Sequence, residues 1–131
     1  MAAIEGTGAS ITFASTGCTL LATSIQSQGI AWEAIPTTHL GTTNAKTFIR
    51  GDLYDPGTIT VNFLTEPENL DTLLSNAAAS ETITITYPDT GAATEASSGF
   101  ITSIDPATSE VDTVVQGSLS VKRTGVITFT D

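Results

Sequence analysis

The sequence predicts a mainly-β fold, an antiparallel β-sandwich or open barrel with one flanking α-helix and one long loop. Apolar residues alternate with Thr and Ser over several segments, and this period of two is typical of half-buried strands. Thr is β-branched and therefore favours strands itself. The pattern of a helix occurs once, without the regular strand–helix alternation that builds parallel sheets. The 131 residues, of which 40% are apolar, suffice for a single domain with its own core.

Three strands are predicted in the first part of the chain. Apolar residues alternate with Thr and Ala over residues 11–14, and residues 18–25 form the second strand. The Gln-Ser-Gln-Gly sequence at 26–29 indicates a turn. The third strand, residues 30–35, has two unlike faces, with Trp32 on one of them.

A segment without clear periodicity follows at residues 36–57, and we predict a long loop there. A loop of this length is uncommon in a compact domain and is usually functional or disordered. This one contains Phe48, Ile49, Leu53 and Tyr54. Because apolar side chains on a protruding loop favour a partner surface, we expect the loop to contact another protein.

The one predicted helix covers about residues 66–79. The sequence Thr-Glu-Pro-Glu at 65–68 fits a capping box with proline in the first turn. Apolar residues then recur at the i, i+3, i+4, i+7 spacing of an amphipathic helix: Leu70, Leu73, Leu74 and Ala77. The other predicted strands are residues 58–64, 81–87, 98–104, 111–123 and 126–129.

The charge of the chain excludes several functions. Fourteen acidic residues oppose only Lys46, Arg50, Lys122 and Arg123, for a net charge of −10. Binding to DNA or to an anionic membrane requires clustered basic residues, so we expect neither. An acidic surface repels phosphate, however, and would let DNA slide past it. The N-terminus has neither the basic region nor the apolar run of a secretory signal, and we expect assembly in the cytoplasm.

No pattern of an active site is recognisable. His39 is the only histidine and Cys18 the only cysteine, so a structural zinc site is excluded, and we expect no metal and no cofactor. A nucleophile-elbow motif is absent, and Glu66 and Glu68 are explained by the helix N-terminus. Trp32 is interpreted as a core residue or a subunit contact rather than a sugar platform. We therefore predict that the protein is not an enzyme.

Several segments resemble the major tail tube proteins of siphophages. Residues 51–63, Gly-Asp-Leu-Tyr-Asp-Pro-Gly-Thr-Ile-Thr-Val-Asn-Phe, are followed by the leucine pattern of the predicted helix, as in that family. Residues 81–89, 99–104 and 114–125 resemble the family's later strands. The match extends over about residues 32–129 and is one of order and spacing.

The resemblance implies a structural protein of a virion tail. Such proteins form rings, commonly hexameric, that stack into a hollow tube through which the genome passes without specific binding. It implies contacts with other copies and, at the tube ends, with other tail proteins. The long loop at 36–57 and, more weakly, an N-terminal arm at 1–10 commonly mediate the contacts between subunits. Candidate interface residues are thus His39, Phe48, Ile49, Arg50, Leu53 and Tyr54.

The composition itself is compatible with such an assembly. Strand edges with few charges are free to pair between copies in a ring, and head-to-tail contacts repeat into a filament. If acids face inward, the lumen is electronegative; the candidates for lumen residues are Asn62, Asp112 and Gln116. Two alternatives stay open. The first is a monomeric β-sandwich binding module of an adhesin, capsid-decoration or carbohydrate-binding type, and the second is a contractile-tail or secretion tube protein.

Overall fold

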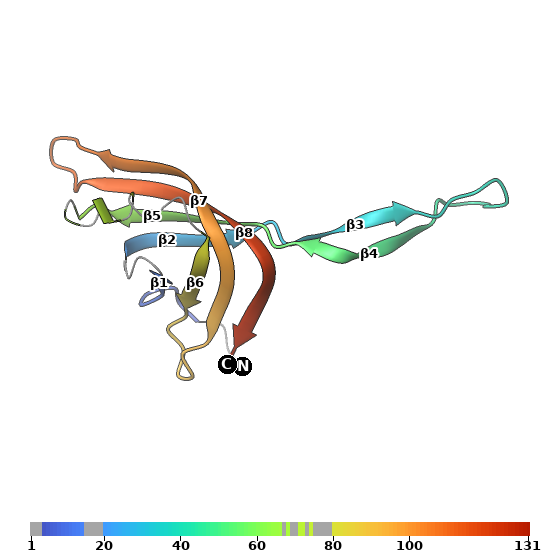
Figure 1. Ribbon diagram of the computed structural model, residues 1–131, viewed down its shortest axis with the longest axis horizontal. Coiled ribbons are helices and arrows are strands. Elements are labelled where there is room, and N and C mark those ends of the chain that lie inside the picture. Colours follow the sequence, from blue (N-terminus) through green and yellow to red (C-terminus); the bar gives the residue numbers. More distant parts are fainter. Residues whose placement is uncertain (1–3, 15–19, 67, 69–70, 73, 75–79) are drawn as a thin grey trace.

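The computed structural model describes residues 4–14, 20–66, 68, 71–72, 74 and 80–131, and within them the fold is mainly β and antiparallel (Figure 1). The strands are β1 (Ser10–Phe13), β2 (Leu21–Gln28), β3 (Ala31–Pro36), β4 (Phe48–Asp55), β5 (Thr58–Leu64), β6 (Glu81–Thr86), β7 (Thr94–Thr108) and β8 (Gln116–Thr130). Six of them form one sheet in the order β1-β6-β7-β8-β5-β2, and β3 and β4 form a separate two-stranded sheet.

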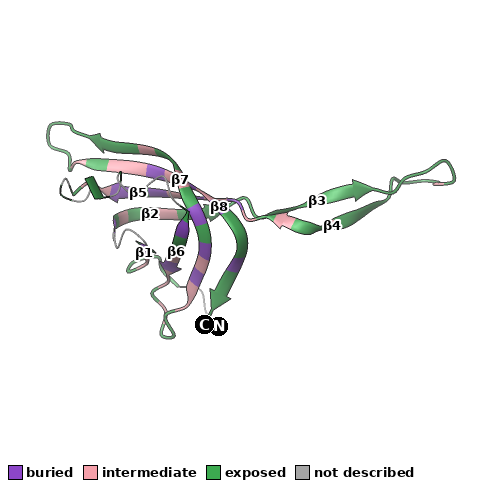
Figure 2. Cartoon of the chain, viewed as in Figure 1, coloured by how far each residue is buried: buried purple, intermediate pink, exposed green. Residues whose placement is uncertain are grey.

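The six-stranded sheet curls into a half-barrel that encloses the core (Figures 1 and 2). Alternate residues of each strand face inward, as the period of two predicted. On β5 these are Ile59, Val61 and Phe63, all at most 2% exposed. The same inward face is built by Ile11, Phe13, Ile83, Ile85, Leu119 and Val121.

Irregular pairing bends the two longest strands. The register between β7 and β8 shifts at three places, between Ala96 and Ser98, Ile101 and Ser103, and Asp105 and Thr108. A β-bulge increases the local twist and bends a strand, so these shifts let one sheet wrap around its own core. This curling corresponds to the open-barrel form of the predicted fold, whereas the described strands do not form a sandwich of two facing sheets.

The β3–β4 hairpin extends away from the half-barrel along the long axis of the molecule (Figure 1). This corrects the predicted long loop at 36–57, because residues 48–55 are a strand paired with β3. The connection between the two strands is therefore only residues 37–47. The prediction failed because β4 has apolar residues on both of its sides, which hides the alternation expected of a half-buried strand.

The predicted helix at about 66–79 is not supported as an element of the described structure. Most of that range lies outside the described residues, and only Glu68, Asp71, Thr72 and Leu74 have a helical assignment. Strand ends also differ from the prediction: residues 26–28 belong to β2, β7 is longer at both ends, and residues 111–113 form a turn. At residues 26–28 and at the C-terminal end of β7, pairing with a neighbouring strand overrides the local turn signal. Residues 111–113 instead lie in the connection between β7 and β8.

Candidate self-assembly surfaces

The two sides of the hairpin have different chemistry. Trp32 pairs with Tyr54, Ala34 with Arg50 and Pro36 with Phe48. Paired residues share a side of a sheet, so the aromatic side of the hairpin is formed by Trp32, Phe48, Arg50 and Tyr54. The alternate positions form its aliphatic side: Ile35, Ile49 and Leu53.

Aromatic packing organises the first of these sides. The rings of Trp32 and Tyr54 are tilted against each other with their centroids 5.3 Å apart. The guanidinium carbon of Arg50 lies 4.9 Å from the centroid of the Trp32 ring, a cation–π arrangement. Arg50 therefore covers one face of the tryptophan and leaves no bare aromatic platform there. The core position considered for Trp32 is wrong, since the residue is 43% exposed.

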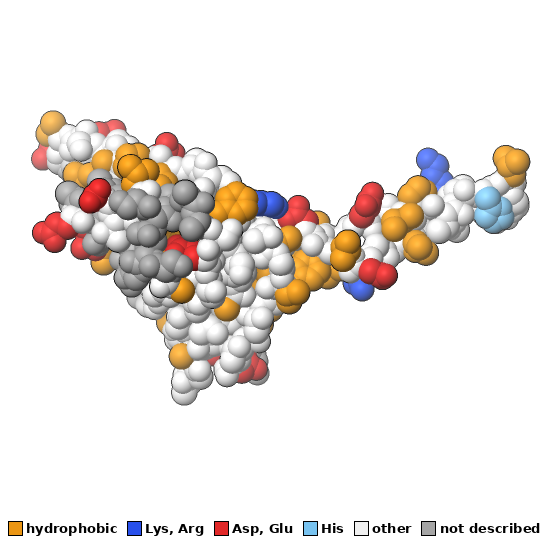
Figure 3. Space-filling view, viewed as in Figure 1, with side chains coloured by type: hydrophobic (Ala, Val, Ile, Leu, Met, Phe, Trp, Pro, Cys, Tyr) orange, Lys and Arg blue, Asp and Glu red, His pale blue; other side chains and the backbone are white. Residues whose placement is uncertain are grey.

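Both sides of the hairpin remain open to solvent in the single chain. Figure 3 shows apolar side chains on the part of the hairpin surface that faces the viewer. The exposed fraction is 56% for Phe48 and for Ile49, and 88% for Leu53. Strands that are apolar on both sides are normally buried on both sides. The single chain thus leaves two apolar surfaces uncovered on one thin projection, which is the pattern of an interaction site.

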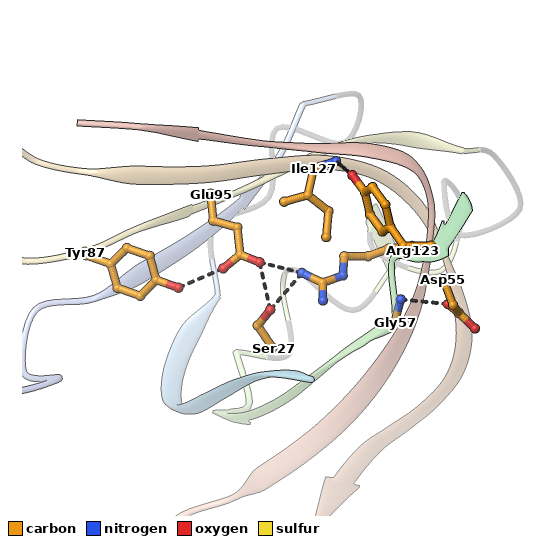
Figure 4. Close-up of polar contacts among 8 residues, drawn as sticks. Ser27, Asp55, Gly57, Tyr87, Glu95, Arg123 and Ile127 are labelled. Atoms are coloured by element: carbon orange, nitrogen blue, oxygen red, sulfur yellow. Dashed lines mark hydrogen bonds and ion pairs between the residues drawn. The ribbon is translucent and has the colours of Figure 1, made fainter. Parts of the chain in front are cut away.

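Polar contacts fix the root of the hairpin to the half-barrel (Figure 4). The Lys122 ammonium donates to Asp55 Oδ1 at 2.7 Å, and the Gly57 amide donates to the same oxygen at 2.8 Å. The ammonium, and then the amide, lower the pKa of the Asp55 carboxyl. On the other strand face, the Ile127 amide of β8 donates to the Tyr54 hydroxyl at 3.1 Å. The hairpin is therefore anchored by two consecutive residues of β4.

The connection at 37–47 is held together by its own hydrogen bonds. The hydroxyls of Thr37 and Thr47 lie 2.8 Å apart. The Gly41 amide donates to His39 Nδ1 at 3.0 Å, and the His39 amide donates to the Thr42 hydroxyl at 2.9 Å. His39 thus organises a turn, and within the described residues no carboxylate contacts its ring as a catalytic triad would require.

Among the described residues, the half-barrel has strand edges that pair with no further strand. β2 ends the sheet on one side and pairs only with β5. β7 pairs with β6 only through residues 94–99, so its second half, paired with β8 alone, has an unpaired edge too. Unpaired N–H and C=O groups in such edges form hydrogen bonds with an added strand.

The outer face of the half-barrel is polar and mostly uncharged over β2, β5 and β8. Ser24, Thr60, Asn62, Ser118 and Ser120 point away from the core side there, and the Asn62 amide donates to the Ser24 hydroxyl at 2.7 Å. Among the predicted lumen residues, Asn62 and Gln116 line one open hollow of about 520 Å³ on this face.

Asp112 lies elsewhere, and this corrects its predicted place on a strand. It forms the apex of the turn between β7 and β8, with a positive φ of 62°. Aspartate tolerates this left-handed conformation better than most residues. The residue is exposed, and its near neighbours Glu110 and Thr113 line the hollow that includes Asn62 and Gln116.

A polar cluster around the buried side chains of Arg123 and Glu95 lies inside the half-barrel, near the hairpin root (Figure 4). Arg123 Nη1 donates to Glu95 Oε1 at 2.5 Å and to the Ser27 hydroxyl at 2.7 Å. The Ser27 and Tyr87 hydroxyls donate to the two oxygens of Glu95, each at 2.8 Å. Burial and the bond to Glu95 raise the pKa of Tyr87 to about 12. The cluster joins residues of β2, β7 and β8 with Tyr87, which follows β6, so we interpret it as structural.

Within the described residues, which do not include Cys18, the acidic and histidine side chains form no group that would hold a metal ion. The described part of the chain also includes no helix with the length and apolar character needed to cross a membrane.

Comparison of the whole chain with solved structures identifies its fold. A chain in the cryo-EM structure of an extracellular contractile injection system, the PVC sheath/tube terminator in its extended state, aligns with a TM-score of 0.76 and 12% identity, covering 100% of this chain and 99% of that one. A chain of the virion of a native gene transfer agent particle aligns with a TM-score of 0.73 and 17% identity, covering 98% of this chain and 100% of that one.

A chain in the tail of the empty gene transfer agent particle, determined with helical refinement and C6 symmetry, aligns with a TM-score of 0.71 and 16% identity over 98% of this chain and 100% of that one. No family model matches the sequence, and no curated protein matches it either. The structural neighbours are components of tail, sheath and tube assemblies, which confirms the resemblance to phage-like tail tubes at the level of the fold.

All six predicted interface residues lie in the hairpin or its tip, so the structure brings them together on one projection. Sequence reasoning did not include Ile35 in this set and left the role of Trp32 open. Both belong to β3, which pairs with β4. Only knowledge of that pairing shows that their side chains continue the apolar surfaces of Phe48, Ile49 and Leu53.

Proposed function

We propose that this protein is a non-enzymatic structural component of a phage-like tail, and that it polymerises as stacked rings into a hollow tube. The observation on which this mainly rests is the hairpin with two exposed apolar sides. A monomer gains nothing from such a projection, whereas a polymer of identical copies covers both sides. The fold shared with tail and tube components supports the same proposal.

Hexameric rings are the form of assembly that we propose. The C6 symmetry of the gene transfer agent tail supports this stoichiometry. The free edges of β2 and of the second half of β7 lie on opposite sides of the β2-β5-β8-β7 part of the sheet, so identical neighbours can pair them around a ring. Other tail proteins then contact the two ends of the tube, and residues 1–10 act as an arm between subunits.

For the lumen, we propose the outer face that includes Asn62 and Gln116, with Asp112 at its rim. Hydroxyl and amide groups bind phosphate weakly, and the net charge of −10 repels it, so DNA passes without being held. The proposed location is the virion tail, with assembly in the cytoplasm of the host. A net basic channel in the structure of the assembled form would refute the lumen assignment.

Electron microscopy of the purified protein tests the proposal. We expect hollow tubes of uniform width in negative stain. The test variant has residues 37–47 replaced by Asn-Gly, a two-residue turn suited to a short hairpin. It should give a folded monomer with an unchanged circular dichroism spectrum and no tubes. Normal tubes from this variant would contradict the role of the hairpin tip, and a wild-type protein that stays monomeric at every concentration would favour the binding-module alternative.

A further inference from the structure

The outer part of the hairpin has a surplus of positive charge. Residues 34–51, here called the distal hairpin, include Lys46 and Arg50 and no acidic residue, so their formal charge is +2. The rest of the chain has −12, since the total is −10. Lys46 and Arg50 are exposed and form no ion pair within the described residues.

The other two basic residues are already neutralised. Lys122 forms an ion pair with Asp55 at 2.7 Å, and Arg123 is buried against Glu95. All positive charge available to a partner is therefore on the distal hairpin. Electrostatic attraction to an acidic surface thus acts at this one end of the molecule.

The opposite end of the molecule is acidic. The turn between β7 and β8, residues 109–115, lies at the far end of the long axis from the hairpin tip (Figures 1 and 3). This acidic turn contains Glu110 and Asp112, both exposed, and no basic residue. Neither carboxylate forms an ion pair within the described part of the chain.

Each of these two ends also exposes apolar side chains. In the acidic turn, Val111 is 90% exposed and Val114 is 62% exposed. On the distal hairpin, Leu40 is fully exposed, and Phe48 and Ile49 are more than half exposed. Apolar contact between the two ends would stabilise an interface between copies. The opposite charges beside it would fix the orientation of the copies and prevent two like-charged ends from meeting.

We propose that the distal hairpin of one copy docks on the acidic turn of another copy, with Lys46 and Arg50 facing Glu110 and Asp112. This inference rests on the proposed function and specifies the contact between successive rings. Because the two surfaces are different and lie at opposite ends, the contact is head-to-tail and repeats along the tube without closing. Like-charged ends repel, which gives the tube a single direction.

Two charge-reversed variants test the pairing. One is K46E/R50E, which makes both ends acidic, and the other is E110K/D112K, which makes both ends basic. Neither variant alone should form tubes at concentrations at which the wild type does. The critical concentration for polymerisation, measured by sedimentation, should be at least tenfold higher for each variant. An equimolar mixture should form tubes again, since each variant then meets a partner of opposite charge. D89K/D131K has the same change in net charge as E110K/D112K but lies outside residues 1–10, the distal hairpin and the acidic turn, and it should polymerise as the wild type does.

The outcomes separate this inference from the proposed function. If the wild type forms tubes and both reversed variants do so at the same critical concentration, the charge pairing is wrong while the tube stands. If each variant fails alone and the mixture also fails although both are folded, the two surfaces do not face each other. If the wild type forms no tubes, the proposed function itself is refuted. Circular dichroism and thermal unfolding of each variant verify folding.

Discussion

The side chains of Arg123 and Glu95 form an ion pair with a 2.5 Å hydrogen bond in the interior of the half-barrel, and both are almost fully withdrawn from solvent. Ser27 from the edge strand β2 and Tyr87 after β6 complete the cluster. Desolvation of two charges offsets much of their attraction, so the pair as a whole stabilises the fold little. The loss of one member, in contrast, leaves a buried charge without its partner.

Arg123→Met is therefore expected to lower the free energy of unfolding by about 3–5 kcal/mol. Combining it with Glu95→Leu should restore part of this loss, because the double variant buries no lone carboxylate. Urea unfolding of the non-polymerising form measures both values. Lys122→Met removes a solvent-exposed ion pair and should have a far smaller effect. Equal losses for Arg123→Met and Lys122→Met would contradict the role of burial.

The raised pKa of Tyr87 makes stability depend on pH in the alkaline range. Its folded-state pKa is about 12 and its ordinary value is 10.0. The folded state thus retains the proton where the unfolded state has lost it, so stability is complete below pH 10 and falls as the pH rises toward 12. Absorbance at the tyrosinate band should show one late titration, which disappears in Tyr87→Phe. A Tyr87 that titrates at its ordinary pKa would show that the residue is neither withdrawn from solvent nor bonded to Glu95 in solution.

Local sequence patterns were sufficient to predict the core-facing residues of the half-barrel, but they were insufficient to predict the β3–β4 hairpin. Ile59, Val61 and Phe63 alternate with polar residues, so their inward direction followed from the period of two. Phe48, Ile49 and Leu53 show no such contrast, because β4 contacts no core and is apolar on both sides. A strand without a buried face gives no one-sided pattern, and that its exposed apolar residues form a partner surface stays a prediction.

The buried cluster shows a second limit of sequence reasoning. Arg123 follows Leu119 and Val121 at the same two-residue spacing, so its inward direction was available from the alternation of β8. Its partners Glu95 and Ser27 could not be predicted, because they are 28 and 96 residues away in the chain. Only the order of strands in the curled sheet brings them together.

The bond between Tyr54 and Ile127 predicts how firmly the hairpin root is anchored. Tyr54→Phe keeps the ring against Trp32 but removes the oxygen that accepts the Ile127 amide proton. Ile127 is 8% exposed, so the unpaired N–H should cost about 1–3 kcal/mol. Hydrogen exchange of the Ile127 amide should become faster by the corresponding factor. Phe48→Leu, which alters the hairpin beyond the root, should leave this exchange rate unchanged; an equal acceleration there would contradict a local anchor.

Gly57 and Gly125 provide a matched test of how closely the hairpin root packs on β2. Both have nearly the same positive φ, 81° and 80°. A Cβ atom on Gly57 would lie 2.0 Å from the carbonyl oxygen of Gln28, whereas a Cβ on Gly125 would meet nothing within 4 Å. Gly125→Ala should cost about 1 kcal/mol of unfolding free energy for its left-handed conformation alone. Gly57→Ala adds a backbone clash and should cost about 3 kcal/mol or more. Urea unfolding measures both free energies. Similar losses for the two variants would show that the backbone at Gln28 moves without cost, and that β2 does not hold the root of the hairpin in place.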